Sequence, residues 1–241
     1  MYLSVVVPAY NEEKNIEKTL RSIFGYLKSR NIEHEIIVVT DGSTDKTADI
    51  VRLLKTEFST LELVDLEKNR GKGFTVKTGM LKAKGDFRLF TDADNATTID
   101  HIEKMMPYFE KGYGVVIASI ALKESNVAAG SEPIWRRVFG KMGNLFIQIM
   151  VVPGIHDTQR GFKIFTASAT EKIFSKMTIE KWGFDIEALA LARKFGFRIK
   201  EVPVDWKNSV ESHVGLKAYF QVLMETVKIR WNLWTWKYEN H

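Results

Sequence analysis

The first 120 residues alternate short apolar runs with amphipathic segments, and this alternation restricts the possible fold more than any other feature of the chain. The apolar runs predict strands at 3–7, 35–40, 61–66, 87–91 and 114–119, and the segments between them predict helices at 12–27, 44–58, 73–83 and 98–109. The runs are continuous in Val, Ile, Leu and Phe, as in strands that helices cover on both faces. Strands and helices that alternate in this way indicate a mostly parallel, doubly wound α/β sheet.

The second half of the chain has a different pattern. Residues 120–132 are small and polar and predict a loop, and Ser131 and Pro133 suit the N-cap and the first turn of a following helix. Further strands are predicted at 161–165 and 198–204, and further helices at 184–195 and 216–236.

Two of these later helices are amphipathic. The first places Ile134, Trp135, Val138, Phe139, Met142, Leu145, Phe146 and Ile149 on one face, and Arg136, Arg137, Lys141 and Asn144 on the other. In the last helix we expect one stripe to be buried, formed by Leu216, Phe220, Leu223, Val227, Trp231 and Trp234.

Composition excludes several classes of protein. The 241 residues are 45% hydrophobic, which suffices for one sizeable core. The chain contains no cysteine, so disulfides and thiolate chemistry are excluded. We expect no signal peptide, because Met1 leads straight into a strand, and no membrane span, because the longest uncharged apolar-rich run (143–155) is too short.

The formal charge of +5 is unevenly distributed. Residues 1–120 hold 17 Lys and Arg against 18 Asp and Glu, whereas residues 121–241 hold 18 against 12 and contain all six Trp. Basic residues interleaved with Trp suit an anionic interface, either a membrane surface or a nucleic acid. A basic surface over a Trp-rich core would give the same composition.

Two carboxylates, Asp92 and Asp94, follow the predicted strand at 87–91. Ligands of a doubly wound sheet bind at the carboxyl ends of its strands. Carboxylates spaced i, i+2 repel each other unless a cation lies between them, and a hard divalent ion that also binds a diphosphate is the natural occupant. A solvated turn that caps the following helix is the alternative interpretation.

Three further loops follow the first three strands and carry residues suited to a nucleotide. Tyr10 can stack on a base, and Glu12 can accept a hydrogen bond from a ribose or a base. Asp41 can accept the imide N–H of uracil, and Gly42 permits the tight turn beside it. Lys72 lies in a glycine-rich turn at a helix start, where it could hold an anion. Each loop alone is compatible with ordinary turn chemistry, but four such loops at one sheet edge predict one shared site.

The order of these motifs resembles glycosyltransferase family 2, of GT-A fold. The matching segments are Val-Val-Pro-Ala-Tyr-Asn-Glu, Val-Val-Thr-Asp-Gly-Ser-Thr-Asp, Asn-Arg-Gly-Lys-Gly and Asp-Ala-Asp. Segments 90–95, 157–163, 182–185 and 202–206 are similar to a narrower branch, the dolichyl-phosphate β-glucosyltransferase and dolichol-phosphate-mannose synthase group. The resemblance covers nearly the whole chain.

The resemblance implies an inverting transfer of a hexose from a nucleotide diphosphate sugar to a polyprenyl phosphate, with Mg²⁺ or Mn²⁺ at Asp92 and Asp94. It also implies a nucleotide-sugar site formed by Pro8, Ala9, Tyr10, Glu12, Asp41, Gly42, Lys72, Gly73, Asp92 and Ala93. We expect a single GT-A domain over 1–241, with a nucleotide-sugar-binding half at 1–120, an acceptor-side half at 121–213 and an amphipathic helix at 214–241.

The acceptor of such a reaction needs cations more than it needs a base. A phosphate monoester has a second pKa of about 6 and is largely dianionic at neutral pH, so two anions must be brought together. The catalytic candidates are Asp157, Arg160 and Lys163, and Asp157 either acts as a base, orients Arg160 or caps a turn. The candidates for binding the acceptor phosphate are Arg136, Arg160, Lys207 and His213.

Two positions depart from the family pattern. Relatives usually carry an arginine after the small pair that closes the fifth strand, where this chain has Ile120, and a lysine is common at the position of His213. A lost cation would weaken donor binding unless Lys123, Arg136 or Arg137 replaces it.

The leading hypothesis is a polyprenyl-phosphate hexosyltransferase, peripheral on the cytoplasmic face of a membrane, with UDP-glucose favoured over GDP-mannose as donor. A family 2 transferase with a soluble or polysaccharide acceptor and a non-catalytic nucleotide-sugar-binding module are the alternatives. A dinucleotide-binding oxidoreductase is disfavoured because no Gly-x-Gly-x-x-Gly follows the first strand. A nucleic-acid partner is disfavoured because it would not explain the acidic strand ends.

Overall fold

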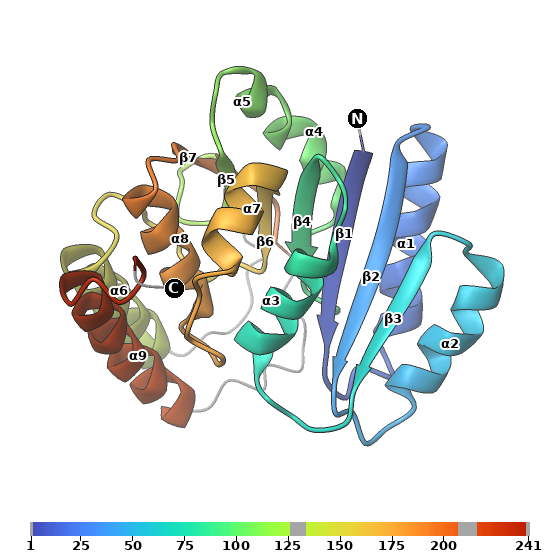
Figure 1. The fold of residues 1–241 in the computed structure, drawn as a ribbon, viewed down its shortest axis with the longest axis horizontal. Coiled ribbons are helices and arrows are strands. Elements are labelled where there is room, and N and C mark those ends of the chain that lie inside the picture. Colours follow the sequence, from blue (N-terminus) through green and yellow to red (C-terminus); the bar gives the residue numbers. More distant parts are fainter. Residues whose placement is uncertain (1, 126–133, 207–215, 240–241) are drawn as a thin grey trace.

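A computed structural model describes residues 2–125, 134–206 and 216–239 (Figure 1). Its centre is a seven-stranded sheet in the order β3-β2-β1-β4-β6-β5-β7. The strands are β1 (Tyr2–Ala9), β2 (Glu33–Asp41), β3 (Leu61–Leu66), β4 (Phe87–Thr91), β5 (Val115–Ser119), β6 (Phe162–Thr166) and β7 (Ile199–Pro203). Only β6 runs antiparallel to its neighbours in this sheet, so the predicted mostly parallel α/β architecture is confirmed.

Most of the helices lie where the sequence predicts them. They are α1 (Ile16–Ser29), α2 (Thr47–Glu57), α3 (Lys72–Lys82), α4 (Ile102–Met105), α5 (Pro107–Glu110), α6 (Ile134–Met150), α7 (Ala167–Phe174), α8 (Phe184–Lys194) and α9 (Leu216–Trp234), with a 3₁₀ turn at Ile99–His101. The helix predicted at 98–109 is interrupted, because Pro107 has no N–H to continue it and instead starts a new turn. The short helix α7 was not predicted. Ser131 and Pro133, predicted as the N-cap and first turn of α6, lie outside the described residues.

Hydrophobic cores lie on both faces of the sheet. Successive residues of a strand point to opposite faces, so Val5 joins one core together with Leu20 of α1, whereas Val6 joins the other together with Met80 of α3. All four of these side chains are buried. The continuous apolar runs of the first half therefore reflect a sheet that is covered on both sides.

Helices α6 and α9 pack against each other, and α9 also contacts α8, at the left edge of the view in Figure 1. The prediction that the large apolar stripe of α9 is buried is wrong for Phe220, Val227, Trp231 and Trp234. Leu223 is half-buried, and the side chain of Leu216 lies outside the described residues. Phe220 is 68% exposed, Trp231 59% and Trp234 70%. The buried face of α9 is instead formed by small, β-branched and polar residues, namely Ala218, Val222, Thr226, Ile229 and Asn232. Small side chains allow close helix packing, and the larger apolar ones point outward.

Helix α6 also exposes large apolar side chains. Met142, Leu145 and Ile149, which the sequence places on its apolar face, are exposed, whereas Ile147 is buried. Asn144, assigned to the polar face, points toward the body of the protein and donates a hydrogen bond to the backbone oxygen of His156. Within the described residues, no helix combines the length and the apolarity needed to cross a membrane.

Candidate active site

The acidic pair lies at the end of β4, as predicted. Oδ1 of Asp92 is buried and lies 2.6 Å from the ammonium of Lys72 at the start of α3. Oδ1 of Asp94 accepts a hydrogen bond of 3.0 Å from the backbone of Ala96. The structure thus brings together two residues, Lys72 and Asp92, that the sequence assigned to the same site from different loops.

The charge of Lys72 depends on its acidic neighbours. Burial acts to lower the pKa of its ammonium, but the carboxylates of Asp92, Asp185 and Asp94 outweigh burial and raise that pKa above its usual value. Lys72 therefore stays protonated at neutral pH. A permanent cation in this position suits the binding of an anionic ligand.

A divalent ion fits this site only if its ligand completes the coordination shell. Among residues 2–125, 134–206 and 216–239, no cluster of three or more Asp, Glu, His or Cys side chains could hold a metal. Asp92 and Asp94 offer hard oxygen donors, and Mg²⁺ commonly takes one or two carboxylates together with substrate phosphates. The buried Oδ1 of Asp92 already contacts the ammonium of Lys72, so this carboxylate is placed where it can bind positive charge.

The first two strand-end loops are tied to each other. Asn11, with a positive φ of 55°, accepts a hydrogen bond on its side-chain oxygen from the backbone of Thr44 at 2.8 Å. The backbone N–H of Glu12 donates to the Thr47 hydroxyl at 2.8 Å. Tyr10 extends from this loop and is exposed, as a base-stacking residue must be.

Asp41 has a structural task that the sequence did not reveal. Its two carboxylate oxygens accept hydrogen bonds from the backbone N–H groups of Arg70 and Gly71, each at 2.8 Å, and the residue is only 4% exposed. A Cβ at Gly42, where φ is +66°, would lie 2.6 Å from the backbone nitrogen of Asn69. Asp41 therefore holds the glycine-rich turn against the end of β2, and its recognition of a base stays a prediction.

The start of α3 is held equally closely. A Cβ at Gly73 would lie 2.7 Å from the backbone oxygen of Ile179, and the N–H of Phe74 donates to the backbone oxygen of Glu180 at 2.9 Å. Gly73 is therefore needed for close approach of backbone to backbone, and this contact fixes the helix end that carries Lys72.

A buried ion pair lies behind the acidic strand end. Nζ of Lys163, which is 0% exposed, donates to Oδ1 of Asp185 at 2.6 Å and also to the backbone oxygen of Arg160. Burial raises the pKa of the Asp185 carboxyl, although the charges of Lys163 and Lys72 oppose this rise. The predicted catalytic residue Lys163 is thus enclosed in the protein, where it supports the loop that carries Arg160.

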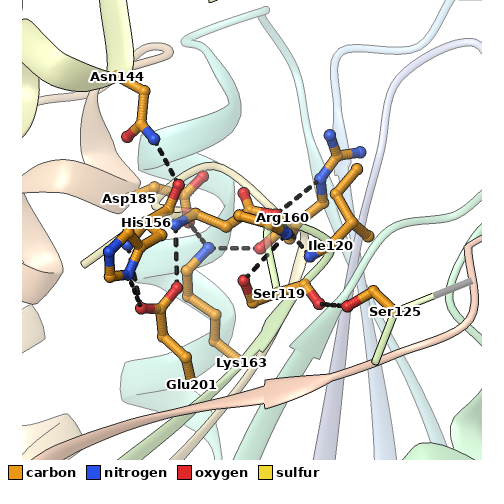
Figure 2. A network of polar contacts seen from close by, with 11 residues as sticks. Ser119, Ile120, Ser125, Asn144, His156, Arg160, Lys163, Asp185 and Glu201 are labelled. Carbon is orange, nitrogen blue, oxygen red and sulfur yellow. Dashed lines mark hydrogen bonds and ion pairs between the residues drawn. The ribbon is translucent and has the colours of Figure 1, made fainter. Parts of the chain in front are cut away.

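The loop of residues 156–161 carries the other two catalytic candidates, Asp157 and Arg160, and Figure 2 shows Arg160 beside Ile120. Oδ2 of Asp157 accepts hydrogen bonds from Nε of Arg160 at 3.2 Å and from the backbone N–H of Ile120 at 2.9 Å. The guanidinium of Arg160 stacks on Trp206, with Cζ 4.8 Å from the ring centroid. Asp157 and Trp206 together fix the direction of this guanidinium.

A backbone contact joins this loop to the acidic strand end. The N–H of Asp92 donates to the backbone oxygen of Gly161 at 3.0 Å. A Cβ at Gly161 would lie 2.0 Å from Oδ2 of Asp92, so any larger residue would displace the carboxylate. The structure therefore places the loop of Arg160 directly beside the predicted metal ligand.

Not every predicted residue can be placed. Lys207, His213 and the side chain of Arg136 lie outside what the structure describes. Lys123 is described and is exposed. At position 120 the backbone N–H, which any residue except proline would supply, makes the contact to Asp157.

The sequence model of glycosyl transferase family 2 matches residues 4–174. The chain belongs to glycosyltransferase family 2. It is 36% identical over 252 residues to a dolichyl-phosphate beta-glucosyltransferase of Dictyostelium discoideum, covering 98% of this chain and 77% of that protein. It is 34% identical over 222 residues to the dolichyl-phosphate beta-glucosyltransferase of Homo sapiens, covering 85% and 67%. The predicted family and its narrower branch are confirmed.

Solved structures of other sugar-transferring enzymes show the same fold. Glucosyl-3-phosphoglycerate synthase from Mycobacterium tuberculosis, in complex with Mn²⁺, uridine diphosphate and phosphoglyceric acid, superposes with a TM-score of 0.70 at 20% identity, covering 95% of this chain and 78% of that one. Mannosyl-3-phosphoglycerate synthase from Rubrobacter xylanophilus gives a TM-score of 0.73 at 16% identity, covering 98% and 75%. The predicted GT-A fold is confirmed.

Proposed function

We propose that this glycosyltransferase moves glucose, with inversion, from UDP-glucose to a polyprenyl phosphate of the dolichyl type, at the cytoplasmic face of a membrane and with Mg²⁺ or Mn²⁺. The observation that supports the proposal best is the backbone hydrogen bond between Asp92 and Gly161, because it holds the loop of Arg160 beside the carboxylates that we assign to the metal. An anionic donor and an anionic acceptor could then meet between these two elements. The names of the relatives support the choice of glucose and dolichyl phosphate.

The donor half of the mechanism rests on Asp92, Asp94 and Lys72. The two carboxylates would hold the metal, which when bound supplies Lewis-acid stabilisation of the leaving diphosphate. Lys72, kept protonated by its acidic neighbours, would exchange its contact with Asp92 for a diphosphate oxygen. The positive charge of Lys72 is thus present before the donor arrives.

The acceptor half rests on Arg160. Within the described residues, its Nε is engaged by Asp157, and this contact leaves the two terminal nitrogens to form a fork suited to a phosphate. Asp157 already accepts two hydrogen bonds on Oδ2, and a dianionic phosphate needs no base. We therefore assign Asp157 to the orientation of Arg160, and Lys163 to the support of the same loop.

Replacing Lys72 with Ala is expected to weaken binding of UDP in the presence of metal by about ten- to a hundredfold, because a charge-assisted hydrogen bond contributes about 1.5–3 kcal/mol. Isothermal calorimetry would measure the affinity. Lys82→Ala, in the last turn of the same helix and paired with Glu62 on the surface, is the matched control and should bind as the wild type does. Equal affinities for the wild type and Lys72→Ala would show that Lys72 does not bind the diphosphate and has a structural role.

The donor is tested by product analysis. The protein is incubated with a short-chain polyprenyl phosphate and Mn²⁺, and separately with UDP-glucose, GDP-mannose or a UDP-N-acetylhexosamine. Mass spectrometry of the lipid fraction is expected to show a hexosyl-phosphate product with UDP-glucose. Product from GDP-mannose alone would overturn the assignment of the donor while keeping that of the acceptor.

The membrane part of the proposal rests on the outer face of α6 and α9. Large apolar side chains are exposed there and on the following turn, namely Met142, Leu145, Ile149, Tyr219, Phe220, Met224, Val227, Trp231, Trp234 and Trp236. On α9 the stripe 220, 224, 227, 231 and 234 follows the spacing of one helix face. A continuous apolar face of this kind marks an interaction surface.

Charge favours a lipid surface as the occupant of this face. Lys217, Lys228 and Arg230 are exposed on α9, whereas its acidic residue, Glu225, turns inward and accepts a hydrogen bond from the backbone of Gly183. Basic residues near an anionic membrane contribute about 1 kcal/mol each, and Trp prefers the level of the headgroups. The helix pair would then lie in the interface without spanning it.

The triple variant Phe220→Ser/Trp231→Ser/Trp234→Ser is expected to lose binding to liposomes that contain anionic lipid, since it removes the largest exposed apolar groups of α9. Co-sedimentation at low salt would measure this loss. Leu53→Ser/Leu81→Ser, which removes exposed leucines of α2 and α3, is the matched control and should sediment as the wild type does. A wild type that stays in the supernatant would contradict the membrane location and favour a soluble acceptor.

A further inference from the structure

The carboxylate of Glu201 lies beneath the loop that carries Arg160 (Figure 2). Its Oε2 accepts a hydrogen bond from the backbone N–H of His156, and its Oε1 accepts one from the backbone N–H of Asp157, both at 3.0 Å. Nδ1 of His156 lies 3.1 Å from the same Oε2. One side chain of β7 therefore binds two successive peptide groups of the loop.

The contact is made by a side chain that is largely enclosed. The Glu201 side chain is 11% exposed, and its residue is paired in the sheet with Ile117 of β5. A strand interior is a rigid base compared with a surface loop. The carboxylate therefore transmits the position of the sheet to His156 and Asp157.

The far end of the loop, Arg160 and Gly161, is held as well as the near end, His156 and Asp157. Lys163 of β6 donates to the backbone oxygen of Arg160, and the oxygen of Gly161 accepts from Asp92. Asn144 of α6 donates to the backbone oxygen of His156 at the near end. Within the described residues, the backbone of the far end is held from β6 and from Asp92 after β4, whereas both backbone N–H groups of the near end are bound by Glu201.

We infer that Glu201 is a positioning residue for the acceptor phosphate, and this inference rests on the proposed function. It acts through a chain of contacts, in which Glu201 fixes the backbone of Asp157, Asp157 fixes Nε of Arg160, and Arg160 meets the phosphate. Neither the metal ligands nor Lys72 belongs to this chain of contacts. A change at Glu201 should therefore affect the acceptor and spare the donor.

A carboxylate is required at this position because two N–H groups must be accepted at once. The amide introduced by Glu201→Gln would offer one oxygen and one NH₂ group, so that one backbone N–H would face another donor. The near end of the loop would then move while the side-chain volume stayed the same. A displacement of about 1 Å near the reacting groups can cost about a hundredfold in rate.

Glu201→Gln is expected to raise the KM for polyprenyl phosphate by about ten- to a hundredfold, with the KM for UDP-glucose changed less than about twofold. Glu62→Gln, an exposed carboxylate on β3 paired with Lys82, is the matched control and should change neither constant. Equal losses for donor and acceptor would overturn the inference, because they would indicate general damage to the fold. An unchanged KM for the acceptor would overturn it too.

Two further measurements separate positioning from folding. If Glu201 acts through Arg160, the double variant Glu201→Gln/Arg160→Lys should be no worse than Arg160→Lys alone, and additive losses would contradict this. Amide hydrogen exchange, read without any substrate, should quicken at His156 and Asp157 in Glu201→Gln. Unchanged exchange would overturn the anchoring itself.

The outcomes also distinguish this inference from the proposed function. A wild type that makes no lipid-linked product would overturn the proposed function, and the acceptor role of Glu201 with it. A working wild type alongside an unimpaired Glu201→Gln would overturn the inference alone.

Discussion

Asp94→Asn is expected to lower the rate of sugar transfer by about 10²- to 10⁴-fold, because a metal ion acting as a Lewis acid supplies several kcal/mol and each 1.4 kcal/mol corresponds to a factor of about ten. The amide keeps the size of the side chain and can still accept the hydrogen bond from Ala96. The loss should therefore arise from the missing charge. Steady-state rates at saturating UDP-glucose and Mn²⁺ would measure it.

The fold of this variant should be intact, with a thermal unfolding midpoint within a few degrees of the wild type. Asp49→Asn, an exposed carboxylate of α2, is the matched control and should keep full activity. Removal of divalent ions with EDTA should abolish transfer by the wild type, and added Mn²⁺ should restore it. Transfer that survives EDTA would show that Asp92 and Asp94 do not serve a metal.

Lys163→Met is expected to lower the free energy of unfolding by about 3–5 kcal/mol, because it leaves the carboxylate of Asp185 buried without its partner. The same change removes the donor to the backbone oxygen of Arg160, so transfer should fall as well. Chemical denaturation at about pH 8 would measure the loss. Lys82→Met breaks an exposed ion pair and should cost less than about 1 kcal/mol.

The pH dependence of this variant gives an independent check. Burial already raises the pKa of Asp185 in the wild type, and removal of Lys163 should raise it further. The folded state would then bind a proton that the unfolded state does not, so its stability falls as the pH rises. The deficit of Lys163→Met should therefore be largest above the raised pKa and should shrink as the pH falls below it. A deficit that does not change with pH would argue that lost packing, rather than the unpaired charge, is the cause.

The Lys163→Met/Asp185→Leu double variant removes both charges of the buried ion pair and so tests whether the unpaired carboxylate causes the loss of stability. With both charges removed, part of the lost stability should return, since apolar replacements of buried ion pairs are often neutral. A double variant less stable than Lys163→Met would contradict this account and would indicate that Asp185 is required by Lys72 or Asp92.

The fold of the first half follows from its sequence because its signals are local. Each of its first four strands is rich in apolar residues, and a loop of candidate functional residues follows it directly along the chain. Pairs that join distant segments carry no such signal: Lys163 and Asp185 are 22 positions apart, and Glu201 is 44 positions from Asp157. Glu201 directly precedes the Val202-Pro-Val-Asp-Trp206 motif, which is the one local hint to it.

Which face of α9 is buried could not be predicted from the periodicity of its apolar residues, for a different reason. A stripe of apolar residues shows which side chains share a face, but not whether protein or another apolar phase covers that face. Phe220 and Trp231 form the stripe, while Ala218 and Ile229 on the opposite face make the contact with the body of the protein. Only the packing of α9 against α6 and α8 reveals this arrangement.

The proposed acceptor is a lipid-linked phosphate, and a competition assay between a lipid and a soluble acceptor decides this. Polyprenyl phosphate in liposomes and soluble phosphoglyceric acid are offered together, at equal concentration, with UDP-glucose and Mn²⁺, and the products are counted by mass spectrometry. We expect glucose almost entirely on the lipid, and we expect less of this product from Glu201→Gln and from Phe220→Ser/Trp231→Ser/Trp234→Ser. Glucose found mainly on phosphoglyceric acid would contradict this expectation.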